Sequence, residues 1–170
     1  HGFNAETGVP VLSYVPSPLA GRLSSALSVT NTSAVSLMDG SPYTGDVLVG
    51  AGEDQRWATY LFASLGRGGK AVFALDVTTP AELTEANAAE VFRWMFTASD
   101  DADLGYQLQD VVRHPTSGQA SPIAYLNNGQ FGLLVPNGYR PSTGRAALFI
   151  LPVSGPVTLS STAGGKSWKD

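Results

Sequence analysis

The sequence of 170 residues contains no cysteine and only two histidines, His1 and His114. Without cysteine the chain can form neither a disulfide framework nor a thiolate metal site, and zinc is not expected. A Ser/His/Asp set is equally unsupported, because one histidine is terminal, the other adjoins Pro115, and the G-x-S-x-G motif is absent. We therefore predict no catalytic, metal-binding or cofactor-binding residue, and no enzymatic activity.

Charge and long apolar runs are also scarce. Ten basic and 14 acidic residues give a net charge of −4, and Lys and Arg do not cluster. This balance argues against nucleic acid as a partner, since phosphate backbones are bound by basic patches. No apolar run approaches the ~18 residues that cross a bilayer, so no membrane span is expected.

The chain is rich in turn-forming residues and contains an internal repeat. Its 19 glycines and 11 prolines separate short apolar runs, as is typical of an all-β protein. "GGKAVFALDV" at 68–77 returns as "GRAALFILPV" at 144–153, which aligns Phe73 with Phe149 at an offset of 76 positions. "WATYLFASLG" from Trp57 similarly matches "FGLLVPNGY" from Phe131. We interpret these matches as two copies of one unit.

The first copy predicts strands at 41–50, 57–65, 70–77 and 91–96. "DVTTP" at 76–80 is expected to form a turn, because it offers an Asx-type side chain and a proline, and the polar insertion that follows forms at most a short helix. The second copy is degenerate: Pro152 replaces Asp76, and its fourth strand is expected from Val157. Residues 1–16 resemble the end of a preceding copy, with a turn that begins at Asn4 and closes at Gly8.

Four antiparallel strands repeated radially define a β-propeller blade. We therefore predict an all-β, incomplete propeller of about two enlarged blades plus part of a third. The expected divisions are 1–16 (end of a preceding blade), 20–35 (a mobile insertion), 36–99 (a blade) and 104–162 (a blade). A chain that starts inside a repeat is expected to be a segment of a longer protein, and its open sheet edges favour edge-to-edge association.

Longer phrases carry a family resemblance. "DGSPYTGDV", "GRGGKAVFALDVTTP", "DDADLGYQ" and "YLNNGQFGLLVPNGY", in this order, resemble the C-terminal propeller of the PilC/PilY family of type IV pilus tip-associated adhesins. The resemblance implies a non-enzymatic protein secreted to the bacterial surface, pilus tip or outer membrane. It also implies pilins, minor pilins and host or abiotic surfaces as partners, and roles in pilus assembly, twitching motility and adhesion.

Calcium is implied for some members of that family, in a loop of the D-x-D-x-D type, which this segment lacks. Its densest acidic stretch holds Asp100, Asp101 and Asp103. These carboxylates could begin a calcium shell, but a turn in which they accept backbone hydrogen bonds is the simpler interpretation.

Two residues of the loop "NGYRPSTG", Tyr139 and Arg140, are the candidate surface-binding residues, because a loop presents them. Trp57, Trp94 and Tyr106 could form a stacking surface for sugars or peptides, although packing between units is the simpler role for the two tryptophans. Two alternative functions stay open: a fragment of a quinoprotein (PQQ) dehydrogenase propeller, suggested by the "ALD…T…W" phrase, and a secreted carbohydrate-binding propeller.

Overall fold

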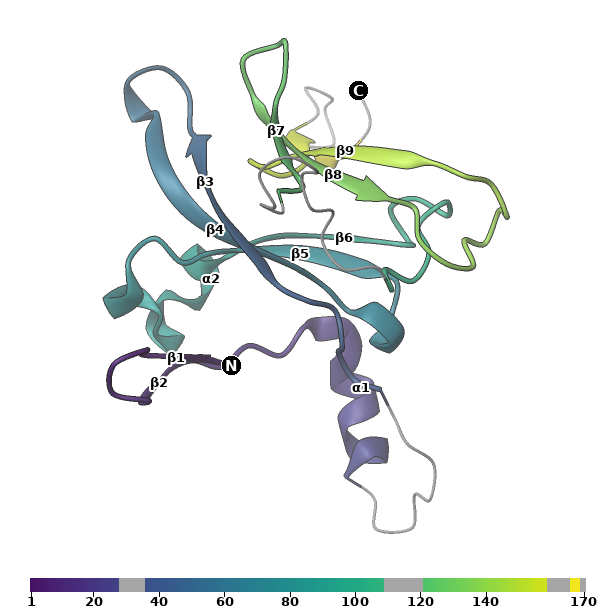
Figure 1. Ribbon diagram of the computed structural model, residues 1–170, viewed down its shortest axis with the longest axis horizontal. Helices are drawn as coiled ribbons and strands as arrows, with labels where there is room; N and C mark the ends of the chain where they lie inside the picture. The colour runs from purple at the N-terminus through teal and green to yellow at the C-terminus, as the bar shows by residue number, and fades with distance from the viewer. Residues whose placement is uncertain (28–35, 109–120, 159–165, 169–170) are drawn as a thin grey trace.

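A computed structural model describes residues 1–27, 36–108, 121–158 and 166–168, and it is mostly β (Figure 1). The larger sheet has four antiparallel strands in the order β3-β4-β5-β6. Their bounds are β3 Tyr43–Val49, β4 Arg56–Ser64, β5 Ala71–Asp76 and β6 Phe92–Thr97. Each lies close to the span predicted from the first copy, which confirms the strand pattern read from alternating apolar residues and glycine turns.

Short helical turns connect these strands. One follows β3 (η1, Gly52–Asp54) and another follows β4 (η2, Gly66–Gly68). The polar insertion between β5 and β6 forms η3 (Pro80–Glu82), η4 (Glu85–Asn87) and the four-residue helix α2 (Ala88–Val91). The prediction of at most a short helix in this insertion is confirmed.

The N-terminal segment begins with a small hairpin, β1 (Gly2–Phe3) against β2 (Pro10–Leu12). Its turn is the one expected from the sequence. The side-chain oxygen of Asn4 accepts hydrogen bonds from the amides of Glu6 and Thr7 at 3.0 and 2.9 Å, and Gly8 adopts a φ of 69°. An asparagine side chain and a left-handed glycine are standard components of such turns.

A helix, α1 (Ser17–Ala26), occupies the start of the stretch predicted as an insertion, and the mobility of that stretch stays a prediction. Leu19, Leu23 and Ala26 are spaced to lie on one helical face, and Leu19 is buried. A stripe of only three apolar residues among serines and alanines is easily overlooked. Residues 28–35 lie outside the described part of the chain.

The second copy forms a sheet of three antiparallel strands, β7 (Ile123–Tyr125), β8 (Phe131–Pro136) and β9 (Leu148–Pro152). The predicted fourth strand of this sheet is wrong. β10 (Val157–Thr158) pairs instead with β11 (Lys166–Ser167). A turn at Gly155, with a φ of 96°, and Pro156, which has no amide hydrogen to donate, separate β10 from β9.

The four-stranded sheet is the middle layer: the hairpin and α1 lie on one side of it and the second sheet on the other (Figure 1). Each interface holds an apolar core. The first core joins Leu19 with Phe73 and Leu75, whereas the second joins Tyr60, Trp94 and Phe96 with residues of β8 and β9. Burial of these side chains is the main term that stabilises the three layers.

The repeat read from the sequence has a structural counterpart in these cores. Phe73 packs against Tyr14 of the preceding segment, with ring centroids 5.1 Å apart. Its repeat partner Phe149 packs against Phe96 of the preceding sheet, also at 5.1 Å. Equivalent phenylalanines therefore make equivalent contacts, each with an aromatic residue of the layer that comes before it in the chain.

Candidate functional site

Two phrases singled out from the sequence lie side by side in space. "DADLGYQ" and "NGYRPSTG" are joined by backbone hydrogen bonds from Gly105 N to Asn137 O (2.6 Å) and, in both directions, between Tyr106 and Tyr139 (2.8 Å each). Two glycines permit this close approach. A Cβ atom on Gly105 would lie 2.4 Å from the Tyr139 carbonyl oxygen, and one on Gly138 would lie 2.4 Å from that of Tyr106.

A salt bridge between Arg145 and Asp103 also joins these two segments. The guanidinium of Arg145 donates to both carboxylate oxygens of Asp103, at 3.2 Å from Nε and 2.9 Å from Nη2, and the Thr143 hydroxyl donates as well. The hydrogen bond from Thr143, followed by those from Arg145, holds the pKa of Asp103 below its ordinary value. The Arg145 side chain is 70% exposed, so this bridge fixes geometry more than it adds stability.

The other two aspartates of the acidic stretch accept backbone hydrogen bonds. Asp100 accepts from the Thr97 amide and hydroxyl at 2.7 Å each, and Asp101 accepts from the Asp103 amide at 2.9 Å. The turn interpretation of Asp100, Asp101 and Asp103 is therefore the one that the geometry supports. Within the described ranges, no group of three or more His, Asp or Glu side chains is placed to hold a metal ion.

The predicted binding residues project from the joined segments. Tyr139 is 57% exposed, and Arg140 lies over its ring with the guanidinium carbon 5.7 Å from the ring centroid. Arg140 has a φ of 55°, the one positive value at a non-glycine residue within the described ranges. Neighbouring residues hold the backbone of Arg140 in this sparsely populated conformation, which presents Tyr139 and Arg140 at the surface. Whether they bind a partner stays a prediction.

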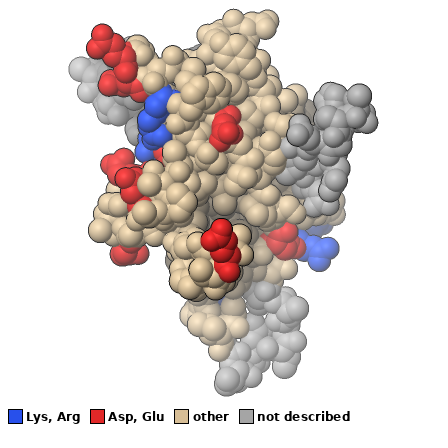
Figure 2. Space-filling view, turned by 60° about the vertical axis from the view of Figure 1, so that its left-hand side comes forward, with Lys and Arg blue, Asp and Glu red and all other residues tan. Residues whose placement is uncertain are grey.

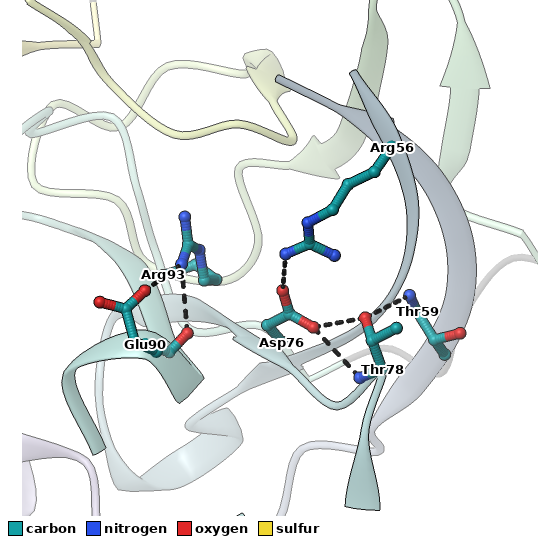
Figure 3. A network of polar contacts seen from close by, with 6 residues as sticks. All are labelled: Arg56, Thr59, Asp76, Thr78, Glu90 and Arg93. Carbon is teal, nitrogen blue, oxygen red and sulfur yellow. Dashed lines mark hydrogen bonds and ion pairs between the residues drawn. The ribbon is translucent and has the colours of Figure 1, made fainter. Parts of the chain in front are cut away.

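A polar hollow of about 590 Å³ lies at the end of the first sheet where β4 begins and β5 ends. At its centre, Asp76 accepts from Arg56 Nη2 at 2.7 Å and from the Thr78 amide at 3.1 Å, while the Thr78 hydroxyl donates to it and accepts from the Thr59 amide at 3.0 Å (Figure 3). Burial raises the pKa of Asp76, but the hydrogen bonds from Thr78 and Arg56 outweigh it and hold this pKa below its ordinary value.

A second guanidinium faces the same hollow because of a β-bulge. Ala74 pairs with Trp94 but Leu75 pairs with Phe92, which leaves Arg93 as the extra residue. Bulges redirect side chains in this way. Arg93 donates to the Glu90 carbonyl oxygen at 3.1 Å and lies 3.6 Å from the Glu90 carboxylate (Figure 3).

The aromatic residues singled out from the sequence differ in exposure. Trp94 is buried and donates from its indole nitrogen to the Val153 carbonyl oxygen at 2.8 Å, which confirms packing between units for this residue. Trp57 also touches the second sheet, in a T-shaped contact with Phe131 at a centroid distance of 5.9 Å, yet it is 62% exposed and lines the polar hollow. Tyr106 lies beneath the Lys70 ammonium group, 5.4 Å from its ring centroid.

The arginines of this hollow were not predicted. Asp76 and Thr78 were recognised only as turn residues, while Arg56 and Arg93 border apolar strands and carry no motif. A charged residue inside "VFRWMF" was the available signal, because a strand buried on both faces rarely contains an arginine.

A second hollow, of about 360 Å³, lies between the two sheets and is mostly apolar. Phe62, Val72 and Leu133 line it, together with Gln107, which is 8% exposed. Among the described residues, the Nε2 atom of Gln107 has no hydrogen-bond partner. His114, expected to be a loop residue, lies outside the described residues.

On the face of the molecule shown in Figure 2, charged groups are thinly spread, and much of this face carries none. Within the described residues no helix is long and apolar enough to span a membrane.

Comparison with known proteins adds to this geometry. No family model matches the chain. It is 30% identical over 170 residues to the type IV pilus biogenesis factor PilY1 of Pseudomonas aeruginosa strain PAO1, which covers 98% of the chain and 13% of that protein. PilY1 of strain UCBPP-PA14 is 30% identical over 89% of the chain and 11% of its own length, and a PilY1 homologue of Xylella fastidiosa is 36% identical over 58% of the chain and 6% of its own length.

The crystal structure of the P. aeruginosa PilY1 C-terminal domain superposes with a TM-score of 0.65 at 28% identity, covering 91% of this chain and 26% of that one. These similarities place the chain among homologues of type IV pilus biogenesis factors. More particularly, the chain is a distant homologue of PilY1 and matches its C-terminal domain. This confirms the resemblance read from the sequence, over a segment that spans only about 11–13% of these Pseudomonas relatives.

Proposed function

We propose that this chain is a non-enzymatic part of a bacterial type IV pilus biogenesis protein that supports pilus assembly, twitching motility and adhesion. The observation that carries the proposal is the match to the PilY1 C-terminal domain over 91% of the chain. The backbone pairing of Tyr106 with Tyr139 supports it, because it joins two of the four phrases on which the family resemblance rests, "DDADLGYQ" and "YLNNGQFGLLVPNGY".

The architecture that we propose for the segment is an incomplete β-propeller with units at 1–16, 36–99 and 104–162. The equivalent contacts of Phe73 and Phe149 support successive units stacked in one direction. A four-stranded antiparallel meander is what one blade requires.

Tyr139 and Arg140 are our candidates for contacts with pilins, minor pilins, or host or abiotic surfaces. An exposed aromatic ring beside a guanidinium on a constrained loop suits protein recognition, in which tyrosine and arginine are enriched. Display at the cell surface, pilus tip or outer membrane follows from this role. We assign no cofactor to the segment, and calcium in the parent protein would require a loop elsewhere.

Deletion of the segment 1–170 from the parent gene tests the role. With production of the remaining protein verified, we expect fewer surface pili or a loss of twitching or attachment. Unchanged piliation, motility and attachment would contradict the proposal.

Point variants locate the contact. Tyr139→Ala with Arg140→Gly keeps the backbone pairing and the left-handed turn while it removes both side chains. We expect weaker attachment with normal protein levels. Tyr125→Ala, which removes another exposed tyrosine, is the matched control and should leave attachment unchanged.

A further inference from the structure

The polar hollow at the end of the first sheet has the size and construction of a small-ligand site. Its volume of about 590 Å³ falls within the ~300–1,000 Å³ range of such sites. The groups that line it come from β4, β5, β6 and the segment that links the last two strands, so they are brought together only by the fold. None of them belongs to the Tyr139 surface discussed above.

Two guanidiniums are held in place at this hollow before any ligand arrives. Arg56 is fixed by Asp76 at 2.7 Å, and Arg93 is fixed by the Glu90 carbonyl oxygen at 3.1 Å (Figure 3). Each guanidinium has five N–H donors, and the hydrogen bond to Asp76 uses one nitrogen of Arg56. Donors that are already positioned lose little entropy on binding, which favours affinity.

The hollow also contains an aromatic platform. Trp57 is 62% exposed even though it makes a T-shaped contact with Phe131, with the centroids 5.9 Å apart. This exposed indole lines the hollow together with the two guanidiniums and supplies apolar surface there. The apolar C–H face of a sugar ring stacks on such a surface, while its hydroxyls bond to planar side chains at the rim.

The charges that line the hollow limit the kinds of ligand that could make these contacts. The ionised groups of the lining are Arg56 and Arg93 against Asp76, Glu82 and Glu90, or two positive and three negative charges. A site of this balance does not attract phosphate or sulfate groups. Hydroxyl groups, in contrast, both accept from guanidiniums and donate to carboxylates, and hydrogen bonds to charged partners are the stronger kind.

We propose that this hollow binds an uncharged saccharide, with one ring stacked on Trp57 and its hydroxyls hydrogen-bonded by Arg56, Arg93 and the neighbouring carboxylates. The proposal is independent of the pilus role, because it concerns binding by the chain itself.

The test titrates the 170-residue chain with neutral oligosaccharides (chitotriose, cellotetraose, maltotetraose and lactose) and with heparin oligosaccharide and inorganic phosphate. Binding is followed by calorimetry and by the indole resonances in NMR spectra. We expect at least one neutral oligosaccharide to bind at millimolar concentration or tighter and to shift the Trp57 indole signal.

Variants assign the site. Trp57→Ala should weaken binding at least tenfold, Trp57→Phe should retain part of it, and Arg93→Gln should also weaken it. Tyr125→Ala, whose ring also touches Phe131, is the matched control and should bind as the original chain does. Circular dichroism verifies the fold of each variant.

Three outcomes would overturn the proposal: no binding of any neutral oligosaccharide at millimolar concentration, binding of the anionic probes alone, or neutral binding that Trp57→Ala and Trp57→Phe leave unchanged. Because these measurements need no pili, they can fail while the pilus role stands, and the reverse also holds.

Discussion

At the scale of single residues, Asp76 decides the geometry at the end of the first sheet. Its side chain is only 11% exposed, which by itself opposes ionisation. The donors from Thr78 and Arg56 compensate, so the carboxylate stays ionised and keeps both Arg56 and the turn after β5 in position. An aspartate that looked like a turn residue in the sequence thus connects a strand end with a guanidinium.

This network predicts acid sensitivity. Since the pKa of Asp76 is lowered in the folded chain, its contribution to stability is present above the ordinary carboxyl pKa of about 3.9 and is lost as the pH falls through the lowered value. Asp76→Asn should therefore show a smaller loss of unfolding free energy between about pH 5 and about pH 2 than the original chain. Urea denaturation across that range measures it.

Thr78→Val provides the matched control, since it removes a donor to Asp76 but keeps the carboxylate. The pKa of Asp76, followed by NMR, should rise toward its ordinary value in this variant. Asp103, whose pKa is also lowered, should preserve part of the acid sensitivity in Asp76→Asn. An unchanged pH dependence in Asp76→Asn would refute this account.

At the scale of elements, the sheets are joined through aromatic residues on the outer strand β6. Trp94 donates to the Val153 carbonyl oxygen at 2.8 Å and contacts Trp168 at a centroid distance of 5.1 Å, while Phe96 meets Phe149. Strand pairing within each sheet is local in sequence, whereas these contacts span more than 50 residues. They therefore hold the layers together where hydrogen-bond ladders do not.

Substitutions at Trp94, which is buried, and at Trp57, which is exposed, test whether Trp94 joins the two sheets. Trp94→Ala should cost about 3–5 kcal/mol of unfolding free energy because it opens a cavity in the core. Trp94→Phe should cost about 1–3 kcal/mol, since it leaves a buried carbonyl oxygen without its donor. Trp57→Ala, at a residue 62% exposed, should cost less than about 1 kcal/mol. Chemical denaturation measures all three, and equal losses for both alanine variants would contradict the assignment.

At the scale of the whole molecule, the layers leave one apolar face uncovered. On β5, the side chains that face the second sheet, Val72 and Ala74, are 5% and 0% exposed. Their counterparts 76 positions later on β9, Leu148 and Ile150, are 62% and 53% exposed. The same apolar pattern thus lies inside the molecule in one copy and on its surface in the other, which is where a further unit of the proposed propeller would pack.

We expect the isolated chain to associate through this face. Ile150→Lys should shift the sedimentation of concentrated samples toward the monomer, since a charge in an apolar contact is costly. Leu27→Lys, at a residue 80% exposed beyond the end of α1, should have no such effect. This interface would be excluded if the chain were monomeric at every concentration, or if Ile150→Lys left its association unchanged.

The sequence by itself determined the strands of the first sheet, the N-terminal turn and the two repeated copies, because alternation, glycine and asparagine act over a few neighbouring residues. Its longer phrases also identified the pilus family. It did not reveal α1, whose apolar stripe is only three residues, and it predicted a fourth strand of the second sheet that instead pairs with β11.

The tertiary structure alone decided which face of each strand is covered and which distant residues meet. The pairing of Tyr106 with Tyr139 joins positions 33 residues apart, and the bulge that turns Arg93 toward the hollow depends on the register of β5 with β6. Register and packing are set by the summed contacts of whole sheets rather than by any local pattern. For that reason Trp94 is buried and Trp57 is exposed, although the sequence assigned both to the same role.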